Sequence, residues 1–361
     1  MSLNTSIRQQ KSFRLPRLAT EDTILLKAVG AALLIWAMIT AIFVWVIPDQ
    51  PGRLVEDGAA FSDFVGRHAA FFLVGFLILS FARMLSESNG TSLVTHMRTV
   101  LAADPARFLG APIMIALSFA SFAIFMLVYS TIKIRIPEIL PFAWDQTFME
   151  WDKAVFFGQD PWRLFAWVYD YPIIVKAIDS IYDIWALMLV GSWVFCFISR
   201  QQSLQRRIQY CLALILTWFI GGNLLAILFS SAGPCYYHLI PGGSDYYAEQ
   251  MAYLNDIGGL YAISHQNMLW QAYSGPGLGF GGISAMPSMH CATTFLIVLM
   301  FGSDRVSKSV IVALFITIFL SSFILAWHYA LDGVLAVIVA YACWRVAGRI
   351  VRAIVPEETE T

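Results

Sequence analysis

The chain has 361 residues, of which 58% are hydrophobic and only 13% are charged, and its formal net charge is -1. Soluble domains carry roughly 25% charged residues, so the composition excludes an ordinary soluble fold and indicates a protein whose solvent is the lipid bilayer. No basic patch with interleaved aromatic residues is present, so nucleic acid is not expected as a partner.

Eight apolar segments are predicted to cross the membrane as helices, because about 20 apolar residues span the hydrocarbon layer. They lie at 24–47, 64–84, 108–129, 178–199, 208–231, 286–302, 309–327 and 329–352. The expected fold is therefore all-α, a polytopic bundle of about eight transmembrane helices. It divides into a basic cytoplasmic tail at 1–23, one membrane domain at 24–352 and a C-terminal tail at 353–361.

The distribution of Lys and Arg predicts which face of the membrane each loop occupies. With both termini inside, sixteen of the 23 basic residues fall in inner segments and seven in outer ones. The long loop 232–284 contains no Lys or Arg, which favours the extracytoplasmic side. We therefore expect a multi-pass membrane protein whose outer loops face the periplasm or an organelle lumen, with a bacterial inner membrane as the favoured location.

Two outer segments are long enough to build part of a site. The first, 130–171, mixes Trp and Phe with aspartates and is typical of short helices that lie in the membrane interface. The second, 232–284, begins with GPCYYH, which contains Tyr236 and Tyr237, and ends with GPGLGFGG, which contains Gly281 and Gly282. Glycines permit close approach of a ligand to the backbone, and tyrosine hydroxyls donate to anions, so these four residues are candidate substrate-binding residues.

The motif SAMPSMH, residues 284–290, is predicted to start a span. Pro287 suits the first helical turn, with Ser284 as the cap, and the Ser288 hydroxyl and free helix amides would form an anion site beside His290. The alternative is a capped helix start with an interfacial histidine.

The motif WHYALDG, residues 327–333, places Asp332 four residues after His328 and so on the same helical face. An aspartate near the top of a span is costly unless it is paired. Its carboxylate can accept a hydrogen bond from one imidazole nitrogen and leave the other as a nucleophile. A purely structural His-Asp pair is the alternative.

The pair PSMH and HYALD resembles two signatures of the type 2 phosphatidic acid phosphatase (PAP2) superfamily, in particular its inositol phosphorylceramide synthase and sphingomyelin synthase-like branch. The resemblance covers about 140–345 and includes FFGQDPW, IDSIYDIW and AGPCYY. It implies a PAP2-like core in which His328 attacks phosphorus, Asp332 orients it, and His290 acts first as general acid and then as general base.

This sequence departs from the family pattern at one important place. The phosphatases carry Ser-Arg upstream of the second histidine, where Ser321 and Ser322 stand here, and the earlier Lys and Arg-Pro signature has no clear counterpart. Lys133, Arg135, Lys153 and Arg163 are the basic candidates for binding phosphate instead. A phosphodiester carries less charge than a phosphomonoester, so the loss favours headgroup transfer.

The leading hypothesis is a lipid phosphotransferase with an extracytoplasmic site. Its expected partners are a phospholipid donor, a lipid alcohol acceptor such as ceramide or diacylglycerol, or water, and the surrounding membrane lipids. The alternatives are a lipid phosphate phosphatase acting on phosphatidate or a polyprenyl diphosphate, and a proton-coupled transporter. No cofactor is expected, and no metal, since the sequence contains no HExxH motif or other metal-ligand spacing.

Overall fold

The computed structural model describes residues 20–46, 74, 92, 94–95, 98–99, 105–199, 201–275, 282–301 and 305–355. These residues form α-helices joined by short 3-10 and π segments, and they contain no strand. The predicted all-α class is confirmed.

Within the part of the chain that the structure describes, five helical stretches are long and apolar enough to cross a membrane. They are α1 (Thr20–Val46), α4 (Pro105–Lys133) continued by α5 (Ile136–Ile139), α7 (Pro172–Asp183) continued by α8 (Trp185–Ile198), α9 (Leu204–Phe219) continued through a π segment, η2 (Ile220–Leu225), by α10 (Ala226–Leu228), and α15 (Ala330–Ile354). The protein is therefore a polytopic helical membrane protein, as predicted.

Two further predicted spans are apolar helices of lesser length. The first is α13 (Met289–Phe301), and the second is the 308–324 part of α14 (Arg305–Ile324). At 1.5 Å per residue, the 13 residues of α13 cover about 20 Å, which is less than the hydrocarbon layer. The predicted span at 64–84 lies outside the described residues, apart from Val74.

The long helices pack around α9, which contacts α1, α13 and α15. Aromatic rings fill the interior: Phe125 stacks on Trp193 at 5.5 Å, and Tyr129 meets Trp218 edge-on at 4.6 Å. Such pairs add about 0.5–1.5 kcal/mol each beyond the burial of their area. The buried Arg207 closes one end of the bundle, because its guanidinium donates to the Cys196 carbonyl and pairs with Glu21 of α1.

Glycines at the π segment bring two elements of the site together. An added Cβ at Gly222 would lie 2.7 Å from the Tyr129 ring, and one at Gly221 would lie 2.9 Å from the Met289 side chain. The absence of a Cβ at Gly222 therefore lets η2 pack this closely against α4, and at Gly221 a Cβ would displace the end of the flexible Met289 side chain. The residue after Met289 is His290.

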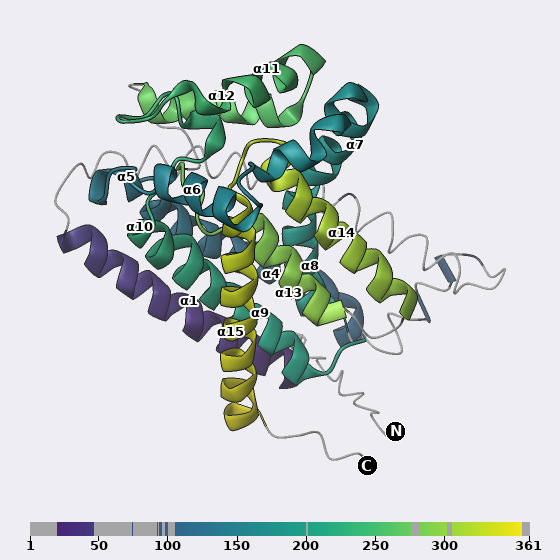
Figure 1. The fold of residues 1–361 in the computed structure, drawn as a ribbon. Coiled ribbons are helices and arrows are strands. Elements are labelled where there is room, and N and C mark those ends of the chain that lie inside the picture. The colour runs from purple at the N-terminus through teal and green to yellow at the C-terminus, as the bar shows by residue number, and fades with distance from the viewer. Residues whose placement is uncertain are drawn as a thin grey trace, which may run out of the picture.

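Short helices gather at one end of the bundle, where α11 (Ala248–Ile257) and α12 (Tyr261–Ser274) lie across the ends of the long helices (Figure 1). With α6 (Asp145–Val155) and the 3-10 segment η1 (Pro161–Asp170) they bury a second hydrophobic cluster. The first outer segment forms short helices, and its large apolar side chains divide between exposed ones, such as Trp151, Phe157 and Trp167, and buried ones. Trp162 is buried, and so are Asp145, Asp152 and Asp160.

Candidate active site

His328 lies in the turn between α14 and α15, and its ring is tied to two acceptors. Nδ1 is 2.8 Å from the Ala285 carbonyl and 3.1 Å from Oδ2 of Asp332. The same Oδ2 accepts a hydrogen bond from the Tyr329 amide at 3.0 Å, so Asp332 also caps the helix it belongs to. Because both partners of Nδ1 are acceptors, Nδ1 carries the proton and Nε2 keeps its lone pair.

Burial keeps the His328 ring neutral. The side chain is almost completely enclosed, and this desolvation lowers its pKa to about 3, although the bond to Ala285 acts in the opposite direction. The positive charge of Lys133 lowers the pKa further. A neutral imidazole with a free Nε2 is the form that can attack an electrophile.

His290 is held by aromatic rings. It stacks on Tyr182 with ring centroids 4.4 Å apart and an angle of 14°, and it lies 3.9 Å from the Trp185 ring. Its centroid is 6.2 Å from that of His328. The structure therefore brings the two predicted histidines together, close enough for one phosphoryl-sized group to contact both rings.

The start of α13 differs from the prediction in its capping. The helix begins at Met289, so Pro287 lies outside its first turn, and Ser284 is not its cap. Ser288 takes that position, with its Oγ accepting from the Cys291 amide at 3.5 Å. Its own amide donates to the Asp332 carbonyl at 3.2 Å, which joins the two histidine motifs directly. Pro287 therefore lies one residue before the cap, whereas the prediction placed it after the cap, in the first turn.

Lys133 is the predicted basic residue that the structure brings to the histidines. Its Nζ donates to the Ser284 carbonyl at 3.2 Å, and its charge acts on His328. Gly282 explains how this approach is possible, since an added Cβ there would lie 2.4 Å from the Lys133 carbonyl oxygen. The role that this glycine has in the structure is therefore close packing against the end of α4.

The other predicted binding residues have different surroundings. Tyr236 donates its hydroxyl hydrogen to the Gln266 carbonyl of α12 at 3.0 Å, and the Tyr237 hydroxyl is bonded to Ser244. Both hydroxyls thus have partners within this part of the protein, and substrate binding by the two tyrosines stays a prediction. Gly281 lies outside the described residues.

The remaining basic candidates also have other contacts. Lys153 lies over the Tyr246 ring at 3.9 Å, and Arg163 pairs with Glu249 at 2.7 Å. Arg135 is buried at the start of α5, and its Nη1 has no hydrogen-bond partner among the described residues.

Asp145 and Asp152 contact the His328 turn but were not singled out from the sequence. Asp152 accepts from the amides of Ala330 and Leu331 at 2.7 and 3.0 Å, and Asp145 accepts from the Tyr329 hydroxyl at 2.9 Å. Their seven-residue spacing was the available signal, because residues i and i+7 share one face of a helix.

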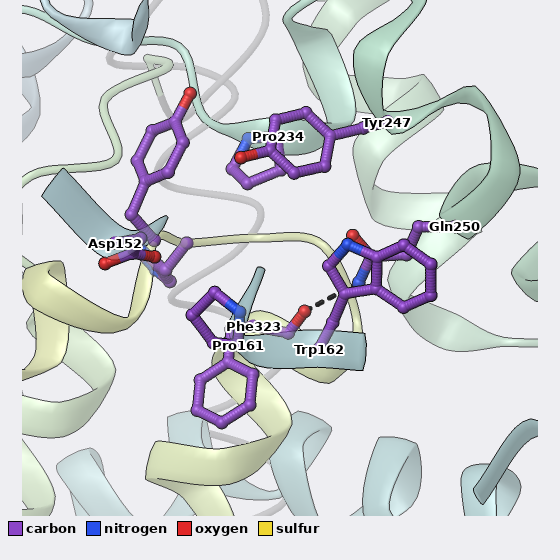
Figure 2. Close-up of a pocket in the computed structure, with 9 residues that line it drawn as sticks. Asp152, Pro161, Trp162, Pro234, Tyr247, Gln250 and Phe323 are labelled. Atoms are coloured by element: carbon purple, nitrogen blue, oxygen red, sulfur yellow. Dashed lines mark hydrogen bonds between the residues drawn. The ribbon is translucent and has the colours of Figure 1, made fainter. Parts of the chain in front are cut away.

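A small pocket lies beside the His328 turn, and the centre of a water-sized molecule could occupy about 10 Å³ of it. Figure 2 shows Asp152 on one side of it and Trp162 with Gln250 on the other. A cavity needs about 10–15 Å³ of such space to hold one water, so this pocket suits a group no larger than a water molecule. Within the described ranges, no group of three or more His, Cys, Asp or Glu side chains is arranged to hold a metal ion.

Comparison with known proteins gives one match. The PAP2 superfamily matches residues 146–346, more than half of the chain and the part that contains both histidines. A search of curated proteins and a search of solved structures each returned no match. The chain belongs to the PAP2 superfamily.

Proposed function

We propose that this protein is a lipid phosphotransferase that moves a phospho-headgroup through a phosphohistidine on His328, in the manner of an inositol phosphorylceramide synthase. The observation that carries the proposal is the state of the His328 ring. Its Nδ1 has two acceptors, which leaves Nε2 unprotonated with His290 nearby. Membership of the PAP2 superfamily supports phosphatase or phosphotransferase chemistry.

The reaction has two steps. In the first, Nε2 of His328 forms a bond to phosphorus while the bond from phosphorus to the glyceride oxygen breaks, and His290 donates a proton to that oxygen. In the second, His290 takes the proton of an acceptor hydroxyl, whose oxygen bonds to phosphorus as the nitrogen–phosphorus bond breaks. Asp332 keeps the proton on Nδ1 and stabilises the charged ring during both steps.

The charge around the site favours a phosphodiester as substrate. Lys133 contributes one positive charge near the histidines, and the amides of Met289 and His290 at the start of α13 have no intrahelical acceptors and so favour an anion. Ser322, the position of the family's arginine, gives no charge; its carbonyl accepts from the amides of Trp327 and His328. A phosphodiester with one negative charge matches this environment better than a dianionic monoester.

The site is proposed to face the periplasm or an organelle lumen. It lies at the end of the bundle where the short helices α6, α11 and α12 gather. The segment 232–284, which contains α11 and α12, has no Lys or Arg. A phospholipid donor and a ceramide or diacylglycerol acceptor would then enter from the surrounding bilayer.

A lipid phosphate phosphatase is the second candidate. The pocket beside the His328 turn favours it, because the pocket has room for about one water molecule and not for the headgroup of a lipid alcohol. Water would then take the place of the acceptor hydroxyl in the second step.

The test uses purified protein in lipid nanodiscs with mixed phospholipids, ceramide and diacylglycerol. Phosphorus NMR and mass spectrometry follow new lipids and free phosphate in wild type and His328→Ala. We expect a new phospholipid from wild type and a loss of at least about 10⁴-fold in the variant, since the nucleophile is gone. Free phosphate without a new lipid makes the protein a phosphatase. Full activity of a folded His328→Ala variant overturns the phosphohistidine route. If wild type forms no product, the proposed activity fails and the transporter hypothesis is the remaining one.

A further inference from the structure

The turn that carries His328 contains a residue in a strained backbone conformation. Ala326, two residues before the histidine, has a φ of 58°, a left-handed conformation that is strained for a residue with a Cβ. Such a conformation persists only where surrounding contacts fix it. The contacts that fix this turn are therefore part of what places His328.

One helix supplies contacts to the part of the turn that follows His328. The buried face of α6 presents Asp145, Phe148 and Asp152, and Figure 1 shows α6 beside the N-terminal end of α15. Asp152 accepts the first two amides of α15, at 2.7 and 3.0 Å, with one oxygen each. These two amides have no acceptor within their own helix, so a carboxylate from another helix supplies their acceptors.

Asp145 extends the same contact to a second loop. Its Oδ1 accepts from the Tyr329 hydroxyl at 2.9 Å and from the Gly233 amide at 2.8 Å, and its Oδ2 accepts from the Ala232 amide at 2.9 Å. Gly233 lies against the turn itself, because an added Cβ would be 2.6 Å from the Trp327 carbonyl oxygen. Asp145 thus joins α6, the 232–233 loop and the residue after His328.

We propose that Asp145 and Asp152 are positioning residues for His328, and that α6 works as a clamp which fixes the 326–331 turn so that Nε2 stays aimed at phosphorus. The inference rests on the proposed function of His328. Neither aspartate needs to touch the lipid. A displacement of about 1 Å in a reacting group can cost about 100-fold in rate, so loosening the clamp is expected to lower kcat much more than it changes KM.

Asp152→Asn is the direct test. Asparagine keeps the size of the side chain but has one acceptor oxygen, so its amide group would meet one of the two helix amides as donor against donor. Asp179→Asn is the matched control, because Asp179 is equally buried and caps α12 by accepting from the Tyr261 and Ala262 amides at 2.6 and 3.0 Å. Both variants lose one cap bond, but only Asp152 acts on the His328 turn.

The expected result is a fall in kcat of about 100-fold for Asp152→Asn, with KM within about twofold, and an unchanged kcat for Asp179→Asn. The assay uses the donor and acceptor that wild type turns over in nanodiscs. Equal kcat losses in both variants would mean that Asp152 only stabilises the fold, which contradicts the positioning role. A wild-type kcat in Asp152→Asn would also overturn the proposal. Should that variant fail to fold, Tyr329→Phe removes only the hydroxyl bond to Asp145 and is expected to lower kcat about threefold to tenfold; no loss there overturns the proposal.

A second readout separates this inference from the proposed function. Diethylpyrocarbonate modifies free imidazole nitrogens, and peptide mass spectrometry reports the rate at His328 without any turnover. The rate is expected to rise severalfold in Asp152→Asn, where the turn is released, and to stay at the wild-type value in Asp179→Asn. If wild type makes neither a new lipid nor phosphate, the proposed function fails, and these rates still decide the clamp: no difference between the two variants rules it out.

Discussion

His328 is held by hydrogen bonds, whereas His290 is held between aromatic rings. The first has its Nδ1 fixed by Ala285 and Asp332, and its turn is bonded to α6. The second lies against Tyr182 and Trp185, and among the described residues neither of its ring nitrogens has a hydrogen-bond partner.

The difference matches the two kinds of work that the proposed reaction requires. A nucleophile needs one tautomer throughout, and fixed acceptors select it. A group that gives a proton in one step and takes one in the next must stay in place in both states, and the neighbouring aromatic rings keep the imidazole in place. The site therefore combines one histidine of fixed tautomer with one of fixed orientation.

Among the tests of this comparison, His290→Gln is expected to give the largest loss of kcat. Glutamine cannot act as a general acid near neutral pH, so kcat is expected to fall about 10³-fold with a natural phospholipid donor. A donor with a p-nitrophenolate leaving group needs no proton, and most of the first step should return with it. His328→Gln is the control that this donor must fail to rescue. A loss in His290→Gln that is equal for both donors would contradict the role of general acid.

Tyr182 offers a smaller test of how His290 is held. Tyr182→Phe keeps the ring that stacks on His290 and removes a buried hydroxyl that has no partner in the described part of the chain. Tyr182→Ala removes the ring itself, and we expect kcat to fall about tenfold, in line with the roughly 0.5–1.5 kcal/mol of an aromatic contact. Tyr182→Phe is expected to keep wild-type kcat. A comparable loss in both variants would show that the hydroxyl, rather than the stack, is the important group.

The two histidines differ as well in how far the sequence predicts their surroundings. The His328–Asp332 contact follows from a four-residue spacing on one helix, which fixes the distance before any tertiary structure forms. The Tyr182 stack and the Asp152 cap join residues 108 and 178 positions apart from their partners, His290 and Ala330, and depend on how separate helices pack. Spans were predictable from hydropathy, but the burial of the aspartates in 130–171 was not, because their acceptor role is visible only once the amides of α15 and the 232–233 loop lie opposite them.

The pH dependence of kcat gives the smallest and most specific expected effect. Burial raises the pKa of Asp152 to about 7, against the opposing effect of the Ala330 and Leu331 amides, and the nearby carboxylates of Asp332 and Asp160 raise it further. The ionised form has two strong acceptor oxygens for the two amides. A protonated oxygen is a weaker acceptor, but it keeps a lone pair that the amide nitrogen of asparagine lacks, so protonation is expected to cost less than Asp152→Asn. We therefore expect kcat to rise about threefold as the pH increases through about 7, and this inflection should be missing in Asp152→Asn.

Stability should change in the opposite direction over the same range. The folded pKa of Asp152 lies above the unfolded value near 3.8, so the folded protein binds more protons between about pH 4 and 7, and the free energy of unfolding decreases as the pH rises through that window. Thermal unfolding of wild type and Asp152→Asn between pH 5 and 8 measures the effect of Asp152 ionisation on stability. The pH profile of kcat measures its effect on the reaction. If kcat and stability rose together with pH, the inflection would reflect folding; opposite directions assign it to the positioning of His328.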